Sequence, residues 1–309
     1  MANLSGRHLT LAGKLLRSPL AWTICVVLGS ASALGQSPSQ SPVDLVRQTV
    51  QCEIQTAQDS RKFFFRERKQ TQNGSQTKLI VETRDLMAGM LVAVNDQALS
   101  PEQRQAEYAR VERIVNDPAE RRRRERQDKE DTDRTKRIMM ALPDAFLYQW
   151  DGTQPGSERM GNAGHDLVRL KFSPNPKYSP PSTVEQILTG MQGDLLIDAI
   201  AHRLAKIEGS LIKDVAFGWG ILGHLDQGGH FLVEQADIGG GNWEVTYMDL
   251  ALTGKALFFK NLKFKSTHVF TDFQPAPANL SVAEGVELLK KQEATLASNR
   301  LPAAADQKR

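Results

Sequence analysis

Histidines are the side chains of this chain most suited to chemistry near neutral pH, so their spacing is a first guide to a reaction. After the N-terminal segment they are His165, His202, His224, His230 and His268. None belongs to a His-Glu-x-x-His motif, and none stands at metal-ligand spacing from a cysteine. His224 and His230 flank a glycine-rich turn and could meet across a hairpin, but turn histidines of this kind are usually solvated. The histidines therefore predict neither a metal centre nor a catalytic base.

Carboxylates offer a second route to chemistry, because paired acids can exchange protons or bind calcium. Asp194 and Asp198 are spaced for one strand face, and Asp214 and Asp226 follow near predicted turns. Aspartates in such places more often bind turn backbone, so we expect no catalytic pair. Cys52 lies near the apolar stripe of a predicted helix, which favours a packed small side chain over a reactive thiol. These residues predict a protein that is not an enzyme and needs no cofactor or metal.

Two glycine-rich segments match phosphate-binding loops only in part. Thr253-Gly254-Lys255 has the end of a P-loop without its upstream glycine, and strand-like sequence follows it where a helix is required. The run Gly239–Gly241 likewise precedes the strand-like 243–247. No Gly-x-Ser-x-Gly motif of a serine hydrolase is present. Both segments are therefore predicted to be hairpin turns.

The N-terminal sequence predicts the cellular location of the protein. Basic residues precede the apolar run Leu20–Leu28, and small residues and then a polar Ser/Pro/Gln stretch follow it. This order is typical of a secretory signal peptide, and the run is shorter than the roughly 20 apolar residues of a membrane-spanning helix. We interpret 1–35 as a signal peptide cleaved after Gly35 and 36–42 as a linker. The mature chain is then expected to be soluble and periplasmic.

Charge and cysteine content narrow the class of partner. The 309-residue chain has a formal net charge of +3, which does not favour nucleic acid. The basic run Arg121–Arg124 is interleaved with acidic residues along one helix, which indicates a solvated face. Peripheral contact of that face with anionic lipid or with a protein partner stays open. Loss of Cys25 with the leader leaves Cys52 alone, so no intramolecular disulfide is expected.

Strands and tight turns dominate the pattern. Residues 63–71 and 78–83 flank Asn73-Gly74, a pair that favours the positive φ angles of a tight hairpin, and an extended run follows at 87–94. From Phe146 onward many short strands predict an antiparallel meander in a barrel or sandwich. These predicted strands are 146–150, 166–172, 194–199, 202–208, 211–219, 230–237, 243–252, 255–264 and 267–273.

Helices are predicted before and after the strands. Apolar residues at helical spacing indicate an amphipathic helix over 43–58. A short helix is expected over 182–188, and a last one, capped by Ser281, runs to about residue 298. The tail 299–309 is expected to be disordered.

A helical insertion at 101–142 interrupts the strands. Ser100 and Asp117 each stand before a proline and begin a helix, and Pro143 is expected to end the second one. Arg121–Arg137 contains no apolar residue, so it cannot be core. The insertion is predicted to lie in solvent or across the mouth of the domain, as a lid or a partner arm.

The order of these elements resembles the periplasmic LolA/LolB/RseB group. Inserted helices precede a long meander that contains Gly193–Asp198, Gly218–Gly223, Gly228–Val233 and Gly241–Val245. The resemblance implies one α+β domain over 43–298, mainly β with inserted helices, forming a half-open antiparallel β-barrel lidded by helices. Members of the group carry lipoprotein acyl chains in the cavity or sense lipidic and misfolded ligands there. A lipid or acylated ligand is therefore the expected partner.

The meander residues of such a barrel either fill its interior or line a cavity. The candidates for the cavity are Phe217, Trp219, Phe231, Val233, Trp243, Val245, Tyr247 and Phe258. The candidates for the lid are Tyr108, Val111, Ile114, Val115, Ile138 and Met139. The leading interpretation is a non-enzymatic carrier of a hydrophobic ligand. The alternative is a filled barrel that acts as an envelope interaction or sensor module.

Overall fold

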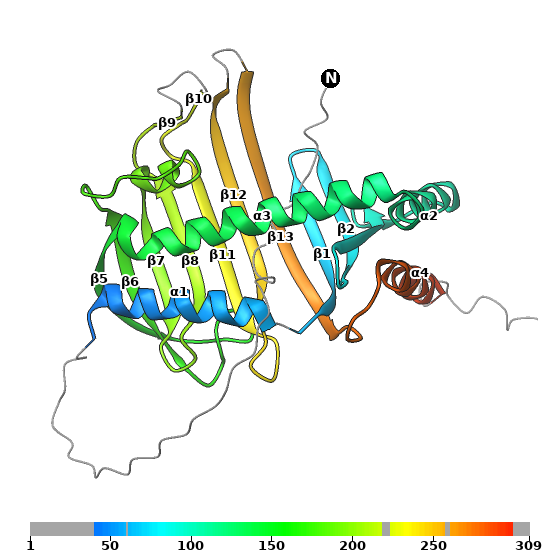
Figure 1. Ribbon diagram of the computed structural model, residues 1–309, viewed down its shortest axis with the longest axis horizontal. Coiled ribbons are helices and arrows are strands. Elements are labelled where there is room, and N and C mark those ends of the chain that lie inside the picture. Colours follow the sequence, from blue (N-terminus) through cyan, green and yellow to red (C-terminus); the bar gives the residue numbers. More distant parts are fainter. Residues whose placement is uncertain (1–39, 60, 218–222, 257–259, 299–309) are drawn as a thin grey trace, which may run out of the picture.

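The computed structural model describes residues 40–59, 61–217, 223–256 and 260–298, which form one large sheet with helices on both sides (Figure 1). The strands are β1 (Phe63–Thr71), β2 (Gly74–Glu82), β3 (Met87–Val94), β4 (Gln97–Ala98), β5 (Phe146–Pro155), β6 (Asp166–Pro174), β7 (Met191–Asp198), β8 (Arg203–Leu211), β9 (Val215–Phe217), β10 (Gly223–Leu225), β11 (His230–Asp237), β12 (Trp243–Ala256) and β13 (Lys260–Pro275). The helices are α1 (Pro42–Asp59), α2 (Pro101–Asn116), α3 (Pro118–Ala145) and α4 (Val282–Ser298), with the 3-10 helix η1 (Glu185–Gly190). The predicted leader and tail lie outside the described residues.

The sheet is antiparallel and open. Its order is β4-β3-β2-β1-β13-β12-β11-β8-β7-β6-β5, and β10 pairs with both β12 and β9 beside this path. β1 pairs with β13, so the first and last strands of the domain are neighbours. The prediction of a mainly antiparallel α+β domain is confirmed, since helices α1 to α4 flank this sheet.

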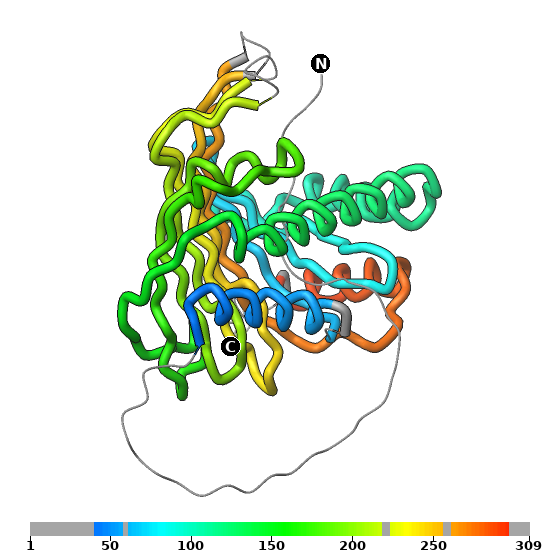
Figure 2. The backbone as a smooth tube through the Cα atoms, turned by 60° about the vertical axis from the view of Figure 1, so that its left-hand side comes forward, coloured from blue at the N-terminus to red at the C-terminus, as the bar shows by residue number. Residues whose placement is uncertain are grey.

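Different helices cover the two faces of the sheet. α1 and α3 cross one face, here called the inner face, and Figure 2 shows both on the same side of the curved sheet. α2 and α4 pack on the opposite, outer face of β1 to β3. The alternation along β1 separates the faces, because Phe64 packs with the residues of α2 and α4 whereas Phe65 packs with Val233 and Phe270.

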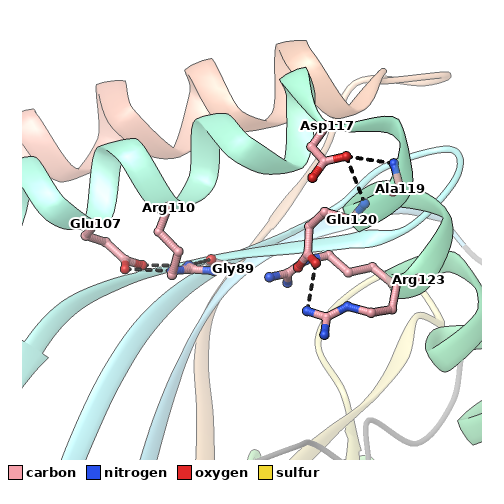
Figure 3. A network of polar contacts seen from close by, with 8 residues as sticks. Gly89, Glu107, Arg110, Asp117, Ala119, Glu120 and Arg123 are labelled. Atoms are coloured by element: carbon pink, nitrogen blue, oxygen red, sulfur yellow. Dashed lines mark hydrogen bonds and ion pairs between the residues drawn. The ribbon is translucent and has the colours of Figure 1, made fainter.

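The predicted starts of α2 and α3 are confirmed. Ser100 forms a capping box with Gln103, and Asp117 accepts a hydrogen bond from the Ala119 N–H at 2.8 Å (Figure 3). The predicted end at Pro143 was wrong, because α3 continues to Ala145. A proline inside a helix removes one backbone hydrogen bond. Burial of Leu142 and Ala145 in the apolar core stabilises this last turn in spite of that loss.

The prediction that the whole insertion lies outside the core was wrong for α2. Val111 and Ile114 are 0 % exposed and pack against β1 to β3 and α4. α4, which is distant in sequence, packs against α2 in this cluster. The sequence pattern of α2 alone could therefore not predict that its apolar stripe is buried. In α3 the buried residues are Leu142, Pro143 and Ala145, all C-terminal to the charged segment.

The turn predicted at Thr253–Lys255 was also wrong. β12 runs without a break to Ala256, and β13 combines most of the two strands predicted at 255–264 and 267–273. Gly254 lies inside β12, where a Cβ atom would come within 2.2 Å of the carbonyl oxygen of His224. The glycine therefore permits close approach of β10 instead of forming a turn. The run Gly239–Gly241, by contrast, has positive φ angles throughout and does connect β11 to β12.

Two smaller expectations also changed. The strand predicted at 211–219 is divided, since β8 ends at Leu211 and β9 is a separate short strand. The helix predicted at 182–188 is the 3-10 helix η1. The hairpin at Asn73-Gly74 is confirmed, with the positive φ of +111° at Gly74. No helix within the described ranges is long and apolar enough to cross a membrane.

Candidate functional site

The inner face under α1 and the end of α3 is an apolar cluster, here called the α1 cluster. Buried side chains of α1 and α3 meet those of β5 to β8 there. Its buried residues include Leu45, Val46, Val50, Leu142, Phe146, Leu170, Phe172, Leu195, Ile197 and Leu204. Gly209 leaves room for two rings, because a Cβ atom would lie 2.7 Å from Phe231 and 3.1 Å from Phe172. This half of the inner face is a conventional packed core.

A second inner cluster, here called the central cluster, lies on the neighbouring strands β2, β1, β13, β12 and β11. It consists of Phe63, Phe65, Ile80, Val233, Val245, Met248 and Phe270. Ile207 packs against both clusters, so they form a continuous apolar surface. The rings of Phe65 and Phe270 meet edge to face with centroids 6.1 Å apart.

A buried polar group lies beside the central cluster on β1 and β13. The Nδ1 atom of His268 is 2.7 Å from a Glu67 carboxylate oxygen, and its Nε2 atom is 3.2 Å from the hydroxyl of Ser266. The side chains of His268 and Glu67 are 4 % and 2 % exposed. Regular alternation on β13 places Ser266, His268 and Phe270 on one face, which brings the polar group next to the apolar rings.

Two lysines of β1 and β2 add positive charge near this group. Burial lowers the pKa of Lys69, and the nearby Glu67 carboxylate partly offsets that effect. Burial also lowers the pKa of Lys78, again against the opposing effect of Glu67. An ammonium group in such surroundings is stabilised by any anion that comes close. The inner face thus combines an apolar wall with a group of charged and polar side chains on β1, β2 and β13.

The order hydroxyl, imidazole, carboxylate also occurs in hydrolases, where the hydroxyl is the nucleophile. Ser266 is 2 % exposed, so its hydroxyl does not face solvent in this structure. The three side chains form an internal hydrogen-bonded network, which fixes their orientation.

α3 crosses the inner face with a charged middle. Figure 1 shows it in front of the central strands, and its backbone packs against α1, α2, η1 and β5. The residues from Arg121 to Arg137 are half-buried or exposed, and none is apolar. Asp128 accepts a hydrogen bond at 2.9 Å from the backbone N–H of Met87 at the start of β3. This part of the helix is held by polar contacts and not by an apolar seam.

The predicted cavity residues do not form one surface. Val233 and Val245 belong to the central cluster, whereas half-buried Phe217 and Phe231 pack at the margin of the α1 cluster. Trp243 is 6 % exposed in a separate small cluster. Trp219 and Phe258 lie outside the described residues.

Tyr247 falls on the other face because of a β-bulge. The register between β11 and β12 shifts so that Glu234 faces Tyr247 and Gln235 faces Val245, leaving Thr246 as the extra residue. An extra residue breaks the two-residue alternation, so Tyr247 cannot share the face of Val245.

The predicted lid residues also separate into two groups. Tyr108, Val111, Ile114 and Val115 pack on the outer face with α4. Ile138 and Met139 pack against the α1 cluster on the inner face. Of the predicted lid residues, only Ile138 and Met139 of α3 therefore lie on the inner face, where a lid would be.

Three other candidates for chemistry contact neighbouring groups within the fold. Asp198 is fully buried, lies 2.6 Å from the Nδ1 atom of His165 and accepts two backbone N–H groups of the following turn. Asp226 forms an ion pair with His224 at 3.2 Å. Cys52 is half-buried and free, with its sulfur 3.8 Å from the carbonyl oxygen of Ala201. Within the described part of the chain no three His, Cys, Asp or Glu side chains are grouped to hold a metal ion.

The polar group of the inner face was not predicted as a unit. Glu67 and Lys69 follow Phe65 at two-residue spacing, so they share its face of the strand. Charged residues on a face that begins with a core phenylalanine could have indicated a buried polar group. Ser266 and His268 share the same spacing on β13. The pairing of β1 with β13, which brings the two signals together, is not visible in the sequence.

Comparison with known proteins finds distant likeness among solved structures. No protein family and no curated protein matches this chain. The crystal structure of a DUF1329 family protein from Desulfovibrio piger aligns with 80 % of this chain and 97 % of its own, at 11 % identity and a TM-score of 0.28. A likeness at this level carries no functional argument.

Proposed function

We propose that this protein is an exported, non-enzymatic binder or carrier of a lipid-like ligand. In this proposal the curved sheet is a half-open barrel, α1 and α3 are its lid, and the ligand lies between them and the inner face. The observation that carries the proposal is the polar middle of α3. A helix without apolar residues from Arg121 to Arg137 crosses the inner face beside an extensive apolar surface.

The chemistry of the inner face suggests an amphiphilic ligand. An acyl chain placed against Phe65, Val233 and Phe270 would gain about 0.8 kcal/mol for each buried methylene group. Lys69 and Lys78 lie near this apolar surface on β1 and β2, and their ammonium groups would attract an anionic head group.

The contacts that hold the middle of α3 can be exchanged at low cost. Within α3 the ion pairs Arg124–Glu120 and Lys129–Asp133 are local to the helix and would survive its displacement. The Asp128 contact with Met87 would have to open or shift. A net hydrogen bond contributes only about 1 kcal/mol, which the burial of a few methylene groups offsets.

Binding of a fluorescent fatty acid tests this proposal directly. The wild-type protein should bind the probe saturably, and Lys78→Met should weaken binding of the carboxylate probe while sparing its methyl ester. Phe270→Ala should weaken both probes by about tenfold, through loss of apolar contact. Ile200→Ala is the matched control, because Ile200 is 70 % exposed and lies outside both clusters.

A second candidate is an interaction or sensor module with a filled interior. It is favoured by the burial of the central cluster, where Phe65 is 5 % and Val233 9 % exposed without a ligand. The same titration separates the two functions. A folded protein that binds neither probe would contradict the carrier and support the module.

A further inference from the structure

The distal parts of β12 and β13 form an arm that extends beyond α3 (Figures 1 and 2). In this arm residues 251–256 pair with residues 260–265. β10 pairs with the far part of β12 in this arm, from Leu225 opposite Gly254 to Gly223 opposite Ala256. The sequence from Leu250 to Thr271 contains four lysines and neither Asp nor Glu. The arm is therefore a basic hairpin of β12 and β13, with β10 along the β12 side.

The arm has an apolar side and a basic side, and both are exposed. Leu262 and Phe264 are 36 % and 43 % exposed, and Phe264 lies opposite Leu252 on the same side. Lys263 and Lys265 alternate with them on β13, and both are exposed on the other side. Large exposed apolar side chains next to one another mark an interaction surface.

Two acidic groups near the arm already have contacts within the fold. Asp226 lies 3.2 Å from the Nε2 atom of His224, which faces Lys255, and Asp249 accepts a hydrogen bond from Thr267 at 2.6 Å. The arm itself carries Lys255, Lys263 and Lys265 on its exposed side without a carboxylate between them.

We infer that this arm docks on an anionic lipid surface. The surface of a bilayer offers acyl chains for Leu262 and Phe264. It also offers phosphate groups for the lysines, a short distance away on the other side of the arm. Lysine stems are long enough to reach phosphates at the sides while the apolar residues enter the interface. A protein partner would need one groove that provides both an apolar surface and anionic groups at the matching positions. The inference is independent of the ligand proposed for the inner face.

Vesicle binding tests the inference with the chain from Gln36 to Arg309, which keeps every described element and omits the apolar run Leu20–Leu28. Vesicles of phosphatidylcholine mixed with phosphatidylglycerol should bind it more tightly than vesicles of phosphatidylcholine alone, and added salt should weaken this binding. Lys263→Glu and Lys265→Glu should each weaken binding by at least about fivefold at low salt. Leu262→Ser with Phe264→Ser should weaken it by at least about tenfold.

Matched controls keep the test specific to the arm. Lys129→Glu changes an exposed lysine of α3, and Met140→Ser changes a methionine that is 56 % exposed. Both should bind vesicles as the wild type does. Circular dichroism and thermal melts must show that the arm variants are folded, since surface substitutions rarely change stability by more than about 0.5 kcal/mol. If wild-type protein ignores anionic vesicles, or if folded arm variants bind as well as the controls, the inference is wrong and a protein partner takes its place.

Discussion

The two edges of the sheet differ in how their unpaired backbone groups are protected. An edge strand presents unpaired backbone N–H and C=O groups, which can pair with another chain and cause aggregation. At one end β4 pairs only with Ala93 and Val94 of β3, and side chains of the helical insertion cover the rest of that edge of β3. β5 at the other end is open and carries exposed apolar residues.

The cover of β3 is made of charged residues. The N–H of Leu91 donates to Glu107 at 2.6 Å, and Arg110 donates to the carbonyl oxygen of Gly89 at 2.5 Å (Figure 3). The N–H of Met87 donates to Asp128 of α3 at 2.9 Å. Charged side chains of the insertion therefore form the hydrogen bonds that a neighbouring strand would otherwise form with β3.

The protection of β5 comes from its own backbone. Its pairing with β6 shifts between Trp150 and Thr153, and Gly152 there has a φ angle of +92°. Pro155 ends the strand. A bulge and a proline make an edge harder to extend, even though Leu147 and Trp150 are 53 % and 42 % exposed. The comparison teaches that the charged insertion has a structural task at β3 besides any role as a cover of the inner face.

The largest expected difference between the two edges concerns apolar burial. Ile114→Ala in α2 should lower the free energy of unfolding by about 2–5 kcal/mol, because Ile114 is fully buried behind β3. Leu147→Ala in β5 should change it by less than about 0.5 kcal/mol. Urea denaturation measures both. A large loss at Leu147 would show that β5 is covered by another copy in solution.

The polar cover of β3 should contribute less than apolar burial but remain measurable. Glu107→Ala removes the acceptor of the Leu91 N–H and the partner of Arg110, and should lower the free energy of unfolding by about 1–3 kcal/mol. Concentration-dependent association should also increase, which light scattering detects. Glu112→Ala is the control, since this residue of the same helix pairs with Lys290 away from β3. Equal behaviour of the two variants would refute the edge cover.

Acid should weaken the start of α3 slightly. A hydrogen bond from Arg123, helped by the nearby Arg124, holds the pKa of Glu120 below its ordinary value, against the effect of partial burial. A lowered folded pKa gives stability that is present above the unfolded value of roughly 4.3 and lost as the pH falls through the folded pKa. Glu120→Gln should remove this dependence, which is worth less than about 1 kcal/mol at a partly exposed pair. Thermal melts across that range measure it, with Glu125→Gln as the control that should keep the wild-type slope.

The smallest effect on folding is expected at the open edge. Leu147→Ser with Trp150→Ser should leave the free energy of unfolding within about 0.5 kcal/mol of wild type. The same change should reduce self-association at high protein concentration, as sedimentation velocity would show. Met140→Ser, a change at an exposed residue of α3, should not reduce it. Unchanged association in both variants would mean that the bulge alone protects β5.

Local signals were predictable because they act over a few residues. Ser100 and Asp117 cap their helices through side-chain contacts three or fewer residues away, and Gly74 supplies the positive φ of its hairpin. The alternation of β11 was clear enough to give its limits at His230 and Asp237. Proline and glycine signals were less reliable where packing from elsewhere decided the outcome, as at Pro143 and Gly254.

The sequence by itself determined most of the element types, the caps of α2 and α3 and the antiparallel character of this protein, since each depends on residues close together in the chain. Tertiary structure alone decided three features: α2 is core, Tyr247 faces outward, and Glu67 meets His268. Each depends on a partner distant in sequence, namely α4 for α2, the register of β11 for Tyr247 and β13 for Glu67. Side-chain burial and ion pairing are set by which surfaces meet, and local periodicity does not encode which surfaces those are.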